Sequence, residues 1–222
     1  MSQTHARILF DGAASEVGTT PLGSGGTAVI DPTTPVYLGT EWDYFETGGP
    51  YSVDVNYPAG IRKGDVAILF AQLWDWSDMT IPTIATPPSG YTLISSISQT
   101  GADSLNALVQ YAYYRILDGT ETTVSYTANS SAEWGNLVLH VFTNASGVDT
   151  SSTWSGGAWT NTRQLKGLTT QADNDLVIAN LFPFSAEVTS AAPSGWTEVW
   201  TDGSNGKFLW TMARPSGSYL AN

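Results

Sequence analysis

Three carboxylates in the first quarter of the chain have a spacing that could carry acid–base chemistry. Glu41, Asp43 and Glu46 belong to the segment Glu-Trp-Asp-Tyr-Phe-Glu. If this segment is a β-strand, Glu41 and Asp43 share one face, because successive side chains point to opposite sides. A β-bulge could bring Glu46 round beside them. Two carboxyl groups placed in this way could serve a retaining glycoside hydrolysis.

The Glu-x-Asp-x-x-Glu spacing of residues 41–46 resembles the nucleophile, helper and acid/base residues of a jelly-roll glycoside hydrolase family. That family usually has smaller aliphatic residues at the positions of Trp42 and Tyr44. The segment also lies close to an N-terminal region of loose composition. We therefore interpret it as an acidic strand or loop that faces solvent, assign no catalytic residue, and keep the hydrolase as an alternative.

The other candidate chemistry consists of isolated residues. His140 lies between Leu139 and Val141 in an apolar strand, where a lone histidine is usually a satisfied core residue, and His5 lies near the N-terminus. Asp173 and Asp175 flank Asn174 and carry oxygen atoms that suit Ca²⁺, but residues of these types also form turns before strands. Calcium binding by Asp173 and Asp175 is left open, and no cofactor or metal residue is assigned.

Nine tryptophans offer a second kind of site, because aromatic rings stack on sugars as readily as they fill cores. Four of them lie in or beside expected loops, where contact with a glycan is possible: Trp74, Trp76, Trp154 and Trp159. Three others lie in or beside expected strands and are better core candidates: Trp196, Trp200 and Trp210.

Composition excludes several classes of function. The chain of 222 residues has 20 acidic and 8 basic residues and a net charge of -12, so nucleic acid is not an expected partner. It contains no cysteine and therefore no disulfide or thiolate site. The first residues do not form a basic region followed by an apolar stretch, and no apolar run approaches a membrane span. We expect neither signal-peptide secretion nor membrane insertion.

Strand patterns dominate from Val36 onward. Segments 64–71 and 136–142 are apolar at both odd and even positions, which indicates a sheet covered on both faces, whereas residues 122–127 alternate. The sequence thus predicts an all-β jelly-roll or immunoglobulin-like two-sheet sandwich. Nine strands are expected, at residues 51–57, 66–74, 91–96, 107–116, 122–127, 136–143, 176–182, 197–201 and 208–213.

Residues 1–40 are expected to form an extended N-terminal arm, and residues 41–222 the sandwich. The arm is rich in Gly, Thr, Ser and Pro, and its apolar islands at residues 8–10 and 28–30 are too small to fold alone. We expect these islands to add short strands to a neighbouring subunit when the protein docks.

The sandwich region contains an internal echo that suggests two related halves. In each copy an Asp-initiated apolar strand is followed by a Pro-Ser-Gly-aromatic-Thr segment and an aromatic strand. The first copy comprises residues 65–70, 88–94 and 111–114, and the second comprises residues 175–180, 193–199 and 208–210. We interpret the Pro-Ser-Gly segments as structural corners whose aromatic residues, Tyr91 and Trp196, enter a shared core.

Four features in succession resemble sandwich domains of tailed-bacteriophage virion proteins. They are a Gly-Asp-apolar strand at residues 64–71, the Pro-Ser-Gly-Tyr-Thr turn at 88–92, an aromatic strand at 109–114 and Gly-Val-Asp at 147–149. The resemblance covers about residues 50–213. Such domains occur in head decoration proteins, head fibres, and tail or receptor-contacting components.

The resemblance implies a non-enzymatic structural protein on the capsid surface, assembled in the host cytoplasm. The first expectation is a decoration or cement protein that binds the major capsid protein or other virion subunits and self-associates, with a trimer as one option. A tail or fibre component that contacts the host is the alternative within this class. A carbohydrate-binding module and a jelly-roll glycoside hydrolase are the alternatives from other classes.

Overall fold

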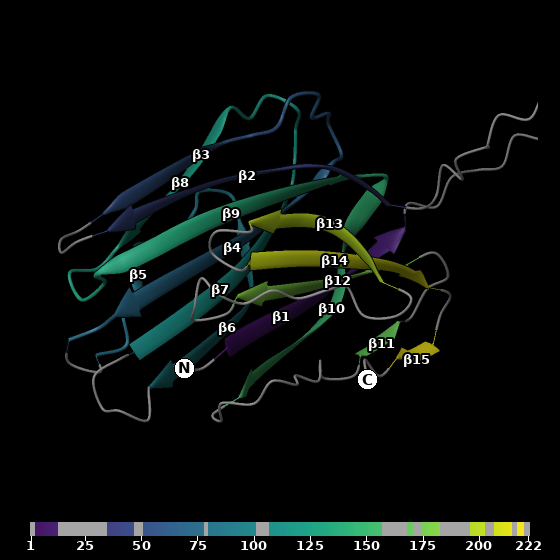
Figure 1. Ribbon diagram of the computed structural model, residues 1–222. Coiled ribbons are helices and arrows are strands. Elements are labelled where there is room, and N and C mark those ends of the chain that lie inside the picture. Colours follow the sequence, from purple (N-terminus) through teal and green to yellow (C-terminus); the bar gives the residue numbers. More distant parts are fainter. Residues whose placement is uncertain are drawn as a thin grey trace, which may run out of the picture.

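All regular elements in the described part of the chain are β-strands. The computed structural model describes residues 3–12, 35–46, 51–77, 80–100, 107–156, 168–170, 175–182, 196–202, 207–214 and 217–219. Their strands pair antiparallel throughout, so the predicted all-β sandwich is confirmed (Figure 1). In these ranges no helix is long and apolar enough to cross a membrane.

A central five-stranded sheet organises the molecule. Its middle strand is buried at all ten positions, as expected for a strand with protein on both sides. In spatial order the sheet consists of β2 (Val36–Glu46), β9 (Trp134–Thr143), β4 (Val66–Asp75), β7 (Ala107–Ile116) and β6 (Thr92–Thr100).

A three-stranded sheet covers one face of this central sheet and completes the sandwich. Its inward residues, including Val55 and Tyr126, pack in one cluster with odd-numbered residues of the central strands, such as Leu69 and Leu139. Alternation along each strand therefore sends one set of side chains into this core. The covering strands are β3 (Ser52–Asn56), β8 (Thr123–Ala128) and β5 (Ile84–Thr86).

A second five-stranded sheet lies against the other face (Figure 1). Leu176 and Ile178 from this sheet pack in a cluster with even-numbered residues of the central sheet, including Ile68, Phe70 and Val138. In order, its strands are β10 (Ala145–Gly156), β1 (Gln3–Gly12), β12 (Asp175–Phe182), β14 (Lys207–Arg214) and β13 (Thr197–Asp202). A separate pair consists of β11 (Leu168–Thr170) and β15 (Gly217–Tyr219).

The internal echo has a structural counterpart. The neighbours β4, β7 and β6 in the central sheet correspond to the neighbours β12, β14 and β13 in the second sheet. Strands β6 and β13 both begin at the Thr of their Pro-Ser-Gly-aromatic-Thr segment. The register shifts between Leu93 and Ser95 in the first copy and between Glu198 and Trp200 in the second, at equivalent positions of the motif. The two halves thus share strand order and register.

The N-terminal segment differs from the expected arm in one respect. Its first apolar island, residues 8–10, lies in β1, which pairs with both β12 and β10 of the same chain. The island therefore adds a strand to the chain's own sheet and not to a neighbouring subunit. Pairing on both sides satisfies the backbone groups that a solitary strand would expose. The second island, residues 28–30, lies outside the described residues.

The two motif aromatics occupy the interior, as the sequence predicts. Tyr91 is partly buried and packs against the sandwich core, and Trp196 is 9% exposed. Trp200 and Trp210 lie in β13 and β14, although their side chains are outside the described ones.

Replacing Trp196 with Ala is expected to lower the free energy of unfolding by about 3–5 kcal/mol, because it removes a large buried ring and leaves a cavity. Chemical denaturation of both proteins measures this difference. Leu93→Ala is the control, since Leu93 is 50% exposed and lies in the equivalent strand of the other sheet. Unchanged stability of the Trp196 variant, with loss of binding to a ligand or partner, would make Trp196 a surface recognition residue.

Deleting residues 1–12 is expected to lower the melting temperature markedly, because β1 is an interior strand and its loss leaves two unpaired edges. Thermal unfolding of the full and shortened chains tests this. An unchanged melting temperature would instead support an arm that is ordered only on docking.

Candidate functional site

The acidic segment 41–46 does not assemble a catalytic pair with Glu46. The register of β2 against β9 runs without a shift from Thr40 to Glu46, and the bulge lies earlier, between Tyr37 and Gly39. Glu41 and Asp43 therefore lie on the side of the strand opposite to Glu46. All three carboxylates are exposed on an edge strand of the central sheet, where charges oppose pairing with another edge.

His140 is a fully buried residue of β9, in agreement with its interpretation as a core histidine. Its Nδ1 is hydrogen-bonded to Oγ1 of Thr40, which also contacts the hydroxyl of Tyr37. The imidazole meets the ring of Phe70 edge-on at 5.8 Å. Burial lowers the pKa of His140 to about 3, so the side chain is neutral near pH 7.

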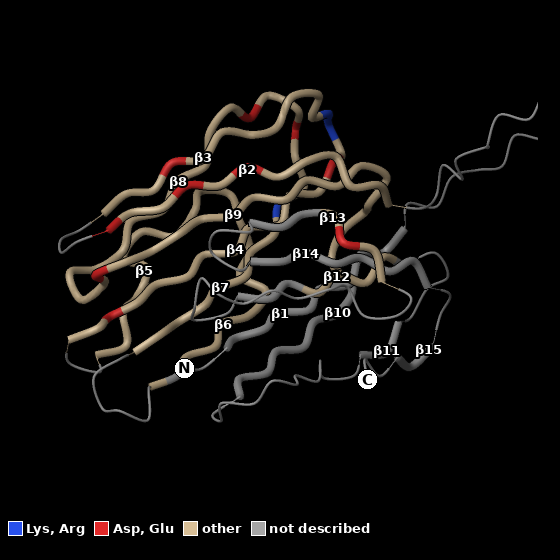
Figure 2. The backbone as a smooth tube through the Cα atoms, viewed as in Figure 1, with Lys and Arg blue, Asp and Glu red and all other residues tan. Residues whose placement is uncertain are grey.

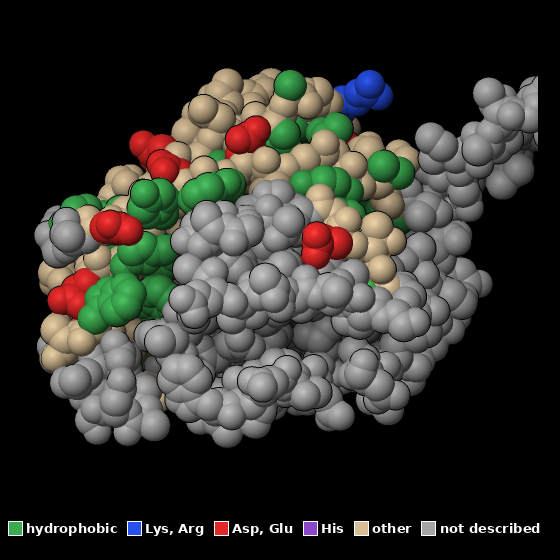
Figure 3. Space-filling model, viewed as in Figure 1, with side chains coloured by type: hydrophobic (Ala, Val, Ile, Leu, Met, Phe, Trp, Pro, Cys, Tyr) green, Lys and Arg blue, Asp and Glu red, His purple; other side chains and the backbone are tan. Residues whose placement is uncertain are grey.

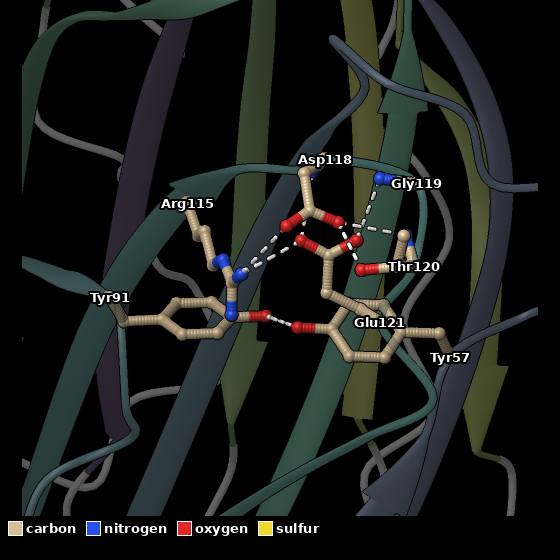
Figure 4. Close-up of polar contacts among 7 residues, drawn as sticks. All are labelled: Tyr57, Tyr91, Arg115, Asp118, Gly119, Thr120 and Glu121. Atoms are coloured by element: carbon tan, nitrogen blue, oxygen red, sulfur yellow. Dashed lines mark hydrogen bonds and ion pairs between the residues drawn. The ribbon is translucent and has the colours of Figure 1, made fainter.

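Polar and charged groups at one corner of the sandwich form a closed network (Figure 4). Arg115 Nη2 lies 2.9 Å from Oε1 of Glu121, whose oxygens accept hydrogen bonds from the amides of Asp118 and Gly119. Gly119 has φ +88, and a Cβ there would lie 2.7 Å from the amide nitrogen of Lys63. The ionic groups of Arg115 and Glu121 thus stabilise the turn after β7.

Two tyrosine hydroxyls extend this corner. Tyr57 and Tyr91 are hydrogen-bonded at 2.8 Å, and burial raises the pKa of each. The turn before Tyr91 places Gly90 beside the guanidinium of Arg115, and a Cβ on Gly90 would lie 3.2 Å from Nη1. The Pro-Ser-Gly-Tyr segment is therefore a structural corner, as expected, and its polar groups are engaged with one another.

A row of amide side chains crosses the central sheet on the face that also meets the second sheet. Gln72 of β4 is in register with Asn136 of β9 on one side and with Gln110 of β7 on the other. All three side chains are at most 2% exposed. Nε2 of Gln72 and both polar side-chain atoms of Asn136 and Gln110 have no hydrogen-bond partner in the described structure.

Such amide groups are costly in a protein interior. A buried donor or acceptor without a partner costs about 1–3 kcal/mol, so this row is an expensive feature to keep in a sheet of Val, Leu and Ala. On β2 the next position of the row is Tyr44, which is in register with Asn136. The row thus leads to the exposed edge of the sheet.

Aromatic rings surround the edge end of the amide row. Trp134 lies beside Trp74, with ring centroids 4.8 Å apart, and Trp74 meets Trp76 edge-on at 5.1 Å. On β2 the rings of Trp42 and Tyr44 stack at 5.9 Å. Trp42, Tyr44 and Trp76 are 37%, 49% and 46% exposed. We call these five rings, with Asn136 and Gln72, the aromatic end of the central sheet.

The surface around the aromatic end is acidic. Figure 3 shows hydrophobic side chains gathered over β2, β9 and β4 next to acidic ones. Glu46 is in register with Trp134, and the amide of Trp76 donates a hydrogen bond to Oε2 of Glu133. Basic positions are few among the coloured residues of Figure 2. Arg62 and Lys63 precede β4, whereas the aromatic end lies where β4 finishes.

The structure divides the tryptophans that the sequence placed near loops. Trp76 is exposed as expected for a binding residue, whereas Trp74 lies within β4 and is buried. Trp154 lies in β10 and His5 in β1, and their side chains are outside the described ones. Trp159 and Asp173 lie outside the described residues, and Asp175 begins β12.

Sequence reasoning missed the aromatic end as a unit. Trp42 and Tyr44 entered only as departures from a hydrolase motif, and the amides were not singled out. A signal existed, because Gln72 and Gln110 are single polar residues in otherwise apolar runs. No group of His, Asp and Glu suited to a metal ion occurs among the described residues.

Comparisons with known proteins give no match to this chain. No family model, no curated protein and no solved structure matches it.

The buried His140 is expected to make the fold acid-sensitive. An unfolded histidine has a pKa near 6.5, so between pH 6.5 and about 3 the unfolded chain binds a proton that the folded chain does not. The free energy of unfolding should fall as the pH falls through this window, by roughly 1.4 kcal/mol per pH unit at most.

The matched variant is His140→Gln, which keeps a polar side chain but cannot titrate. Denaturant unfolding of both proteins from pH 7.5 to 4 gives the difference between their stabilities, and acid titration of the carboxylates cancels from it. The wild type should lose more stability below pH 6.5. Parallel curves would show that His140 does not contribute this sensitivity.

Proposed function

We propose that this chain is a non-enzymatic structural protein of a tailed-bacteriophage particle, in the first place a capsid decoration protein that binds the head shell and self-associates. The observation that carries the proposal is that the two related halves of the chain are structurally equivalent. The residues behind the bacteriophage resemblance, a strand after Asp and a strand after Pro-Ser-Gly-aromatic, recur with the same order and register in both five-stranded sheets. The motif thus describes a sandwich scaffold and not a reactive centre.

The ionisable groups support a role without catalysis. Glu46 faces away from Glu41 and Asp43, His140 is buried and neutral, and the charges around Arg115 are paired in a turn. A decoration protein would act by adding contact area between shell subunits, which stabilises the assembled state by mass action.

A tail or fibre component that contacts the host is the second candidate. The aromatic end favours it, because exposed rings beside buried amides suit recognition of a ligand more than they suit a scaffold. The two candidates differ in where the protein attaches to the particle.

Particle binding and hydrolysis together test the proposal. Purified protein is expected to co-sediment with heads that lack it, and to show no turnover of polysaccharides. Binding to tails but not to heads would select the second candidate. Turnover by the wild type that disappears in Glu41→Gln would contradict a non-enzymatic role, and so would a failure to bind heads and tails alike.

A further inference from the structure

We infer that the aromatic end of the central sheet binds an uncharged carbohydrate chain. This inference rests on the proposed non-enzymatic function and names a ligand class for one surface of the protein. Three features of the described residues carry it: the exposed rings, the buried amides without partners, and the sign of the surrounding charge.

The rings provide apolar platforms on a part of the molecule that solvent reaches. Trp42 and Tyr44 are two residues apart and lie on the same side of edge strand β2, and Trp76 lies just beyond the end of β4. Trp74 is buried and meets Trp76 edge-on, and the half-buried Trp134 lies beside Trp74. Flat aromatic faces match the C–H faces of pyranose rings, and their rigid side chains lose little conformational entropy on binding.

The buried amides supply hydrogen-bond donors and acceptors, which a purely apolar patch lacks. Asn136 lies in register between Tyr44 and Gln72, and its amide nitrogen and oxygen both lack a partner in the described structure. A sugar hydroxyl is both a donor and an acceptor, so one ligand can satisfy either atom. The inferred ligand would reach Asn136 past the half-exposed Tyr44, the β2 residue in register with it. A ligand without hydroxyl or amide groups would leave these atoms unpaired.

Charge narrows the class of carbohydrate. Glu46 lies on the same side of β2 as Trp42 and Tyr44 and is in register with Trp134. Glu133 accepts a hydrogen bond from the amide of Trp76, and the net charge of the chain is -12. On the central sheet and the loops before it, Arg62, Lys63 and Arg115 lie toward the other end of the strands, where β4 begins and β7 finishes. Sulfated or carboxylated polysaccharides are therefore repelled from the aromatic end, and neutral chains are not.

Affinity electrophoresis of the full chain tests the inference. The gels contain dextran, laminarin, xylan or dextran sulfate, and tryptophan fluorescence titration gives the affinity for each polysaccharide that retards the protein. We expect retardation by at least one of the three neutral polymers and none by dextran sulfate. Trp42→Ala combined with Tyr44→Ala should weaken binding at least tenfold. Leu93→Ala and Ile116→Ala are the controls, because both residues are exposed apolar residues away from the aromatic end.

Asn136→Leu separates a ligand contact from a structural role. Removing an unpaired buried amide in favour of an apolar side chain of similar size should leave thermal stability unchanged or higher, while affinity for the neutral polysaccharide falls. Loss of stability with unchanged affinity would show that Asn136 only packs the sheet and would overturn its part in the site.

Other outcomes overturn the inference as a whole. These are no retardation by any of the three neutral polymers, stronger retention by dextran sulfate, or equal weakening by the control variants. Co-sedimentation with particles is measured on the same variants. If the Trp42 and Tyr44 variant loses particle attachment, the surface is a protein contact. If the wild type binds particles but no neutral polymer, the carbohydrate inference fails while the proposed function stands.

Discussion

Burial of the central sheet on both faces is the constraint on which the rest of the structure depends. Strand β4 has no exposed position, so each of its residues needs a packing partner on one side or the other. The three-stranded sheet packs against the odd positions from Ala67 to Leu73, and the second five-stranded sheet packs against Val66, Ile68 and Phe70. Removing either cover would expose a continuous apolar surface, which water disfavours in proportion to its area.

The same constraint explains what the sequence could predict. Apolar runs on both faces identify β4 and β9 as central strands, and alternation identifies β8 as a covering strand. Repetition of the Asp-apolar and Pro-Ser-Gly-aromatic segments indicates two related halves. The apolar and alternating patterns are local, because each lies within about ten residues, and the repetition can be found by comparing one stretch of sequence with another.

Features that depend on pairing between distant segments could not be predicted. The composition of residues 1–40 suggests an arm, yet the apolar island at residues 8–10 gains two partner strands more than 130 residues away in the chain. The aromatic end also depends on pairing between segments that are distant in the sequence. Trp74 meets Trp134, and Asn136 meets Tyr44 and Gln72, only because the registers of three strands coincide. No spacing within one segment reveals such a meeting.

Burial of the central sheet on both faces also restricts where this protein can bind a ligand. Inside the sheet a polar side chain has to form its hydrogen bonds with protein groups, as Nδ1 of His140 does with Thr40. The side-chain amide of Asn136 has no hydrogen-bond partner in the described structure. Asn136 is paired with Tyr44 of the edge strand β2, where the rings of Trp42 and Tyr44 are exposed. An apolar residue at that position would be cheaper for the fold. The cost of Asn136 is therefore best explained by a ligand group that completes its hydrogen bonds at the edge of the sheet.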